Sequence, residues 1–176
     1  RLLKSLPPLA SGLAVLVALV TAGSAFGAGV YWDTNDANAG AGSPADGNWS
    51  TAEAFWSPVA DGNVAPQVWS NGDDAIFAAG SDAAGGTVTL LDTVDANHVN
   101  IEEGAWTFDG DGQLTLYNGL NVAASLGTQT FDANTTVQLN GDSEWFIDTG
   151  STVSLDGNLA GDNNYNQLDK LGDGTL

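Results

Sequence analysis

Hydrophobic and polar residues alternate along the second half of the chain. In Thr87-Val88-Thr89-Leu90, the apolar residues share one face of an extended segment and the threonines share the other. The same two-residue period occurs in 98–101, 105–108, 113–116, 136–139 and 152–155. This period predicts short β-strands with one face in the core and one in solvent. The residues expected to point inward are Val88, Leu90, Val99, Ile101, Trp106, Phe108, Leu114, Leu116, Val137, Leu139, Val153 and Leu155.

Turn-forming residues separate these segments. Glycine, aspartate and asparagine fill the gaps at 109–112, 140–142 and 156–158, and they adopt positive-φ turn conformations readily. No segment after the N-terminal region has the periodicity of a long amphipathic helix. The chain is therefore expected to be all-β. The pattern suits either a β-solenoid, in which successive turns stack, or a β-sandwich or barrel.

The N-terminal region has the pattern of a secretory signal peptide. Arg1 and Lys4 precede an apolar run at 9–20, and small residues follow. The apolar run is short for a membrane-spanning helix, which needs about 20 residues. We therefore expect export with cleavage after Ala25 or Gly27, and no transmembrane segment in the mature chain.

Tryptophan is concentrated in the next region, at positions 32, 49, 56 and 69, among glycine, asparagine, aspartate, serine and proline. We expect these rings to cover the open end of a β-core, because each buries a large apolar area. If exposed, Trp49, Trp56 and Trp69 would instead be candidates for stacking on the sugar rings of a glycan. The predicted organisation is a signal peptide at 1–27, a Trp-rich N-terminal β cap at 28–80, and a solenoid repeat region at 81–176, truncated at its C-terminal end.

The charge of the chain excludes several classes of protein. Its 176 residues include 3 Lys and Arg against 22 Asp and Glu, which gives a formal net charge of −19 at pH 7. Nucleic-acid binding needs clustered basic residues and is therefore not expected. The absence of cysteine excludes disulfides, thiolate nucleophiles and cysteine-based metal sites.

Candidate catalytic chemistry is sparse. His98 is the only histidine, and its strand places it on the polar face, where a solvated histidine is the expected role. Adjacent carboxylates such as Asp73-Asp74 point to opposite faces of a strand, and a glycosidase needs two that face one cleft. We assign no catalytic residue and no cofactor, and we expect the chain not to be an enzyme.

One turn has the alternating oxygen ligands of a calcium site. In Asp109-Gly110-Asp111-Gly112 the two carboxylates are candidate metal ligands, which would allow weak Ca²⁺ binding. The segment lacks the downstream glutamate of an EF-hand loop and the tandem copies of calcium-binding β-helices. A plain β-turn is therefore the favoured interpretation.

The C-terminal segment resembles a known repeat. Residues 168–176, Leu-Asp-Lys-Leu-Gly-Asp-Gly-Thr-Leu, resemble the start of the autotransporter-associated β-strand repeat. The layout from Trp32-Asp33 through 69–77 to 87–90 is also similar to proteins that carry this repeat. The resemblance implies a secreted passenger-type protein folded as a right-handed parallel β-helix. An antiparallel β-sandwich is the alternative fold.

The resemblance also implies a function. It suggests a non-catalytic bacterial passenger, secreted or held at the cell surface or outer membrane, that serves adhesion or acts as an envelope scaffold. Its partners would be cell-surface or matrix polysaccharides or proteins. The alternative is a polysaccharide-binding module or a glycan-degrading β-helix enzyme with paired carboxylates. A cleft with convergent carboxylates beside exposed Trp faces would favour that alternative.

Overall fold

The computed structural model describes residues 27–162 and 166–176, and these residues form β-strands joined by turns and loops. The predicted signal peptide, apart from Gly27, lies outside the described residues. Across the described part of the chain, no helix is long and apolar enough to cross a membrane. The strands are β1 (Gly29–Trp32), β2 (Gly47–Trp49), β3 (Ala54–Ser57), β4 (Gln67–Val68), β5 (Asp74–Phe77), β6 (Gly85–Leu90), β7 (Thr93–Ile101), β8 (Ala105–Asp109), β9 (Gln113–Val122), β10 (Gly127–Phe131), β11 (Thr136–Leu139), β12 (Ser143–Ile147), β13 (Ser151–Leu155), β14 (Asn158–Gly161) and β15 (Leu168–Leu171).

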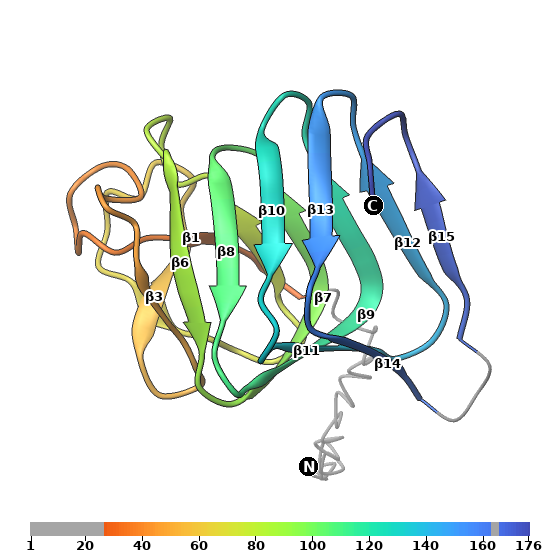
Figure 1. The fold of residues 1–176 in the computed structure, drawn as a ribbon. Coiled ribbons are helices and arrows are strands. Elements are labelled where there is room, and N and C mark those ends of the chain that lie inside the picture. Colours follow the sequence, from red (N-terminus) through yellow and green to blue (C-terminus); the bar gives the residue numbers. More distant parts are fainter. Residues whose placement is uncertain (1–26, 163–165) are drawn as a thin grey trace, which may run out of the picture.

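Parallel pairing between successive turns builds the fold. One sheet has the strand order β13-β10-β8-β6-β2, and its four pairings are all parallel. The other sheet contains the remaining ten strands and is parallel everywhere except at β3 and β4. Hydrogen bonds between neighbouring turns join residues 21 to 25 positions apart in the sequence. The parallel β-helix predicted from the sequence is therefore confirmed, and the antiparallel sandwich is not formed (Figure 1).

The solenoid has three sides. The outer side of the sheet β13-β10-β8-β6-β2 is called here the hydroxyl face, because Thr87, Thr107, Thr130 and Ser154 line up on it in register. The long strands β7 and β9 bend and contribute to both other sides. Their first halves pair with each other, and β9 continues the pairing to β11 and β14. Their second halves join β1, β5, β12 and β15 on a side called here the groove face.

The inward residues predicted from alternation form the core. All of them are buried except Leu155, which is half-buried and packs against the core from the C-terminal end of the stack. Aromatic rings in equivalent positions of adjacent turns stack, as in Phe108 and Phe131, whose centroids lie 4.7 Å apart. The alternation therefore separates the residues that stabilise the fold from those available for binding.

A buried glutamine interrupts the apolar column. Gln129 lies at an inward position and is fully buried. Its side-chain oxygen accepts a hydrogen bond from the Trp106 backbone N–H at 2.8 Å, and its amide nitrogen donates to the carbonyls of Gly104 and Leu126 at 3.2 and 3.4 Å. These bonds offset the cost of burying the amide and tie together backbone segments of two turns.

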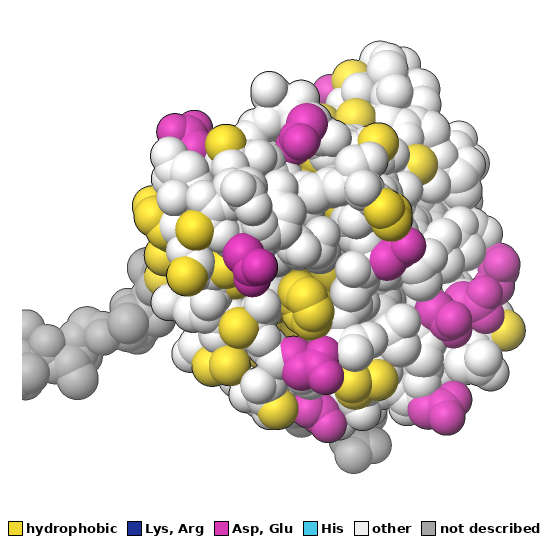
Figure 2. Space-filling model, turned by 90° about the vertical axis from the view of Figure 1, so that its left-hand side faces the viewer, with side chains coloured by type: hydrophobic (Ala, Val, Ile, Leu, Met, Phe, Trp, Pro, Cys, Tyr) yellow, Lys and Arg dark blue, Asp and Glu magenta, His cyan; other side chains and the backbone are white. Residues whose placement is uncertain are grey.

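The N-terminal end of the solenoid is closed by aromatic residues and by an antiparallel pair of strands. Strand β3 pairs antiparallel with β1, and β4 pairs with β3. Beneath them, the ring of Trp56 lies 4.7 to 5.2 Å from the rings of Trp32, Trp49 and Trp69. Viewed from outside, this end carries scattered carboxylates and small apolar patches, with no Lys or Arg in view (Figure 2).

The parallel stack extends into the Trp-rich region. Strand β1 pairs in parallel with β5, and β5 pairs in parallel with β7. The expected division between a cap at 28–80 and a solenoid at 81–176 is therefore not a break in this sheet. The strands that depart from the solenoid pattern, β3 and β4, lie in the segment between β2 and β5.

Candidate binding surface

Two rows of outward side chains run along the groove face, across the strands. Parallel register places equivalent residues of successive turns next to each other, about 4.8 Å apart. The first row is called the acidic row and the second the mixed row. The acidic row contains Asp74, His98, Gly119, Glu144 and Asp169. The mixed row contains Tyr31, Ile76, Asn100, Asn121, Phe146 and Leu171.

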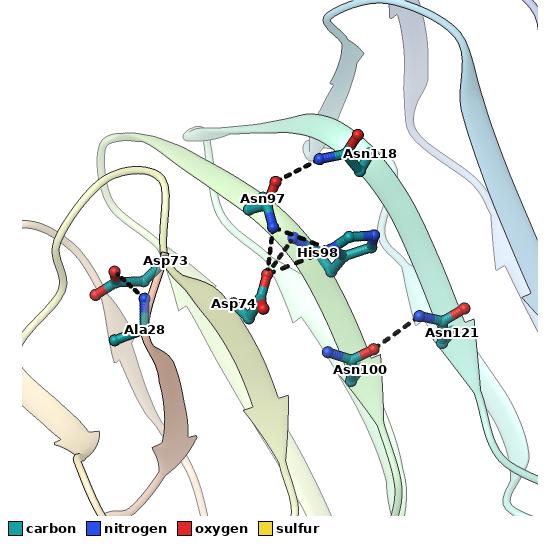
Figure 3. Close-up of polar contacts among 8 residues, drawn as sticks. All are labelled: Ala28, Asp73, Asp74, Asn97, His98, Asn100, Asn118 and Asn121. Atoms are coloured by element: carbon teal, nitrogen blue, oxygen red, sulfur yellow. Dashed lines mark hydrogen bonds and ion pairs between the residues drawn. The ribbon is translucent and has the colours of Figure 1, made fainter. Parts of the chain in front are cut away.

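His98 is held by a polar network at the N-terminal end of the acidic row (Figure 3). Asp74 Oδ1 accepts hydrogen bonds from Asn97 Nδ2 at 2.7 Å and from the His98 backbone N–H at 3.1 Å, and it lies 3.3 Å from His98 Nδ1. Asn118 Nδ2 donates to Asn97 Oδ1 across the bulge between β7 and β9. The histidine therefore lies on the polar face as predicted, but it is paired with a carboxylate and is only partly exposed.

A hollow lies at the acidic row, between His98 and Glu144. Gly119 is aligned with both of these residues and is itself buried. A Cβ atom there would lie about 2.0 Å from the Glu144 carbonyl oxygen, so no other residue fits without moving the backbone. The hollow measures about 390 Å³ and is lined by His98, Asn118, Asn121, Asp142, Ser143, Glu144 and Asp169.

A second hollow adjoins the first on the mixed row. It measures about 140 Å³ and shares Asn121 with the larger hollow. Phe146 borders it, with 43% of its side chain exposed. Asn121 Nδ2 donates to Asn100 Oδ1 at 2.8 Å, which fixes the orientation of both amides. The groove face thus combines an exposed aromatic ring, oriented amides and carboxylates.

Ser143 and His98 do not form a pair of nucleophile and base. Ser143 lines the same hollow as His98, but its strand is separated from β7 by β9, which places the two residues roughly 9 to 10 Å apart. Its hydroxyl oxygen accepts a hydrogen bond from Trp145 Nε1 at 3.1 Å. A nucleophile and its base must lie within hydrogen-bond reach of each other.

The acidic row does bring two carboxylates together. Glu144 and Asp169 are direct neighbours in register, and both are exposed. The exposed carboxylate oxygens of the pair can accept hydrogen bonds from a ligand.

Burial raises the pKa of two other carboxyl groups, both near the N-terminal end. The pKa of Asp33 rises to about 6, mainly because burial desolvates it and also because Asp36 and Asp82 are nearby; the Asn35 N–H donor opposes this shift. Burial also raises the pKa of Asp73, and the charge of Asp74 adds to it, against a hydrogen bond from the Ala28 N–H.

The tryptophan candidates for glycan stacking lie in the core. The exposed fractions of Trp49, Trp56 and Trp69 are 0%, 1% and 3%. Their rings pack against one another because the end of an apolar column needs a large apolar cover. The structure therefore corrects this candidate role, since no face of these rings is available to a sugar.

The candidate calcium residues lie in the turn between β8 and β9. Asp109 Oδ1 accepts a hydrogen bond from the Gly110 N–H at 2.6 Å, and Gly110 has a φ of 101°. Asp111 is exposed. Within residues 27–162 and 166–176, no group of three acidic or histidine side chains is placed to hold a metal ion.

Sequence reasoning missed the residues of the groove face. Phe146 and Glu144 were not singled out, and neither were Asn100 and Asn121. One signal was present: the spacing Asn-x-x-Asn occurs at 97–100 and again at 118–121. The hydrogen bonds between these two pairs each span 21 positions, which is one turn of the solenoid.

The fold and this surface define the class of the protein as an acidic parallel β-solenoid with a polar, hollowed outer face. No family model and no solved structure matches the chain. Over 124 residues, or 69% of this chain, it is 36% identical to the Adhesin BmaC autotransporter of Brucella suis biovar 1 (strain 1330). The match spans 3% of the length of that protein. The chain is thus a relative of an autotransporter adhesin, and the predicted resemblance to passenger-type β-helix proteins is confirmed.

Proposed function

We propose that this chain is a non-catalytic segment of an exported, adhesin-like passenger that binds molecules of a cell surface or matrix. The observation that carries the proposal is the similarity to an autotransporter adhesin in a chain that folds as a parallel β-solenoid. A rigid stack of turns presents outward side chains in fixed rows, which suits repeated weak contacts with an extended partner.

The chemistry of the groove face supports binding rather than turnover. Among the described residues, the side chain of its histidine contacts Asn97 and the carboxylate of Asp74 and no serine or threonine hydroxyl, and the neighbouring carboxylates Glu144 and Asp169 are exposed. Polar groups in shallow hollows are typical of recognition surfaces.

An adhesion assay tests the proposal. Beads coated with the full chain are expected to attach to cultured cells or to immobilised matrix more strongly than beads coated with an equally acidic control protein. Equal attachment of both kinds of bead would contradict an adhesive role. Mass spectrometry of the secreted or envelope fraction tests export, with a mature N-terminus expected at Phe26 or Ala28.

A turnover assay tests the catalytic alternative. The chain is incubated with neutral and acidic polysaccharides, and new reducing ends are measured. We expect none above background. Turnover that disappears in Glu144→Gln or Asp169→Asn would replace this proposal with a glycan-degrading function.

A further inference from the structure

We infer that the groove face is a binding site for a neutral glycan, with Phe146 as the stacking platform and Asn100, Asn121 and Glu144 as hydrogen-bonding partners. The inference rests on the proposed adhesive function and names the ligand class and the site. It differs from the tryptophan hypothesis, because the aromatic ring involved is on the outside of the solenoid.

The platform comes from strand β12. The side chain of Phe146 is 43% exposed because it points outward, whereas its strand neighbours Trp145 and Ile147 point inward and are completely buried. In register it lies between Asn121 of β9 and Leu171 of β15, and Leu171 is equally exposed. An aromatic ring in this setting can cover the apolar C–H face of a pyranose and remove that area from water.

The amides next to this ring are oriented for hydroxyl groups. The hydrogen bond from Asn121 Nδ2 to Asn100 Oδ1 fixes which atoms point away from the pair (Figure 3). Asn100 Nδ2 and Asn121 Oδ1 have no hydrogen-bond partner among the described residues. One is a donor and the other an acceptor, which suits adjacent sugar hydroxyls that each donate and accept.

The acidic row selects against charged glycans. Asp142, Glu144 and Asp169 line the larger hollow, and no basic side chain opposes them. Lys170 is the only Lys or Arg in the described residues, and its Nζ donates to the Gly172 carbonyl at 2.7 Å. Uronates, sulfates and phosphates would meet uncompensated negative charge, whereas hydroxyl groups can donate to the carboxylates.

The two hollows provide room for more than one sugar. They share Asn121, so a chain lying across β9 and β12 would contact the larger hollow and the Phe146 ring together. Gly119 allows β9 and β12 to pair this closely beside the path, because a Cβ atom there would lie about 2.0 Å from the Glu144 carbonyl oxygen.

Calorimetry on the full chain tests the site. The titrants are neutral hexasaccharides of glucose, galactose and mannose, with oligogalacturonate as the anionic comparison. We expect binding of at least one neutral hexasaccharide, no binding of oligogalacturonate, and little change with salt. Phe146→Ala and Asn121→Ala are expected to weaken binding roughly tenfold each.

The matched control is Leu159→Ala. Leu159 is 39% exposed on β14, away from the groove face, so its loss removes a comparable exposed apolar side chain without touching the site. Unchanged circular dichroism in all three variants separates lost binding from lost folding. An equal loss in Leu159→Ala, a preference for oligogalacturonate, or no binding of any neutral hexasaccharide would overturn the inference.

The adhesion assay distinguishes this inference from the proposed function. Beads coated with Phe146→Ala should lose attachment if the groove carries adhesion through a glycan. Wild-type attachment that persists in Phe146→Ala and Asn121→Ala would refute the glycan site while the adhesive function stands.

Discussion

The two ends of the solenoid are finished in different ways. At the N-terminal end, β3 covers the edge of β1 in an antiparallel pairing, and tryptophans fill the last layer of the core. At the C-terminal end of the described structure, β14 and β15 each pair with a single neighbour, and Leu159, Leu171 and Leu176 are 39% to 46% exposed. An uncovered edge of a parallel stack offers backbone groups and apolar surface for further pairing. The comparison teaches that each turn is stabilised by its neighbours, so the end that is covered gains contacts that the other end of the described structure lacks.

The largest expected effect is the loss of a tryptophan from the covered end. Trp56 is 1% exposed and contacts the rings of Trp32, Trp49, Trp69 and Phe77. Trp56→Ala is expected to lower the free energy of unfolding by about 3 to 5 kcal/mol, because it leaves a large cavity. Chemical denaturation measures this loss. A loss below about 1 kcal/mol, similar to that expected for the exposed Leu159→Ala, would show that the cluster does not stabilise this end.

A buried charge at the open end should act locally. Val153 of β13 is 1% exposed, and Val153→Asp places an unpaired carboxylate in the core at a cost of several kcal/mol. We expect β13 and the strands after it to detach, with hydrogen exchange protection lost there and kept in β1, β5 and β7. Val153→Ala is the control for volume alone. Loss of hydrogen-exchange protection throughout the chain would contradict the expectation that the C-terminal strands can unfold while the N-terminal strands stay folded.

The covered end should also respond to pH. The pKa of Asp33 is raised to about 6 in the folded protein, against an ordinary value of 3.8, so the folded state holds this proton more tightly. The resulting stabilisation is full below about pH 4 and is lost as the pH rises through about 6.

Comparison with Asp33→Asn isolates this effect from the repulsion among the other carboxylates. The difference in unfolding free energy between the two proteins should change between pH 4 and 6 and be flat above pH 7. A constant difference across that range would contradict the raised pKa. Asp73 titrates in the same sense, because its pKa is also raised, and it remains in both proteins.

The smallest expected stability effect concerns the buried amide between the two ends. Gln129→Ala removes the partners of the Trp106 N–H and of the Gly104 and Leu126 carbonyls. The expected cost is about 1 to 3 kcal/mol, the range for leaving buried polar groups unsatisfied. Gln129→Glu is the comparison, since it keeps the acceptor but loses the donors. A neutral effect of Gln129→Ala would show that water replaces the amide.

Much of the fold was readable from local pattern. The alternation of Val88, Leu90 and Val99 with polar residues predicts the strands and their buried faces, because side chains of a strand point alternately to its two sides. The buried Gln129 breaks that rule, and sequence gives no sign of it, since its partners belong to backbone that is distant in the sequence.

Trp106, Leu114 and Val122 follow one another at equal intervals in the sequence. In the structure these residues point inward from the three successive sides of one turn. The same spacing would arise from antiparallel hairpins, because it reflects only the number of residues between one turn of the backbone and the next. Parallel pairing follows from contacts between residues more than 20 positions apart, which local pattern does not encode.

The sequence by itself determined an acidic all-β chain, its inward residues and its likeness to passenger proteins. These properties depend on composition and on residues that are close in the sequence, so they can be predicted without the tertiary structure. Only the tertiary structure decided that the tryptophans are buried and that His98, Asn121 and Phe146 line one hollowed surface. The physical reason is register: stacking turns in parallel aligns residues from different turns within about 5 Å, and that alignment creates the surface.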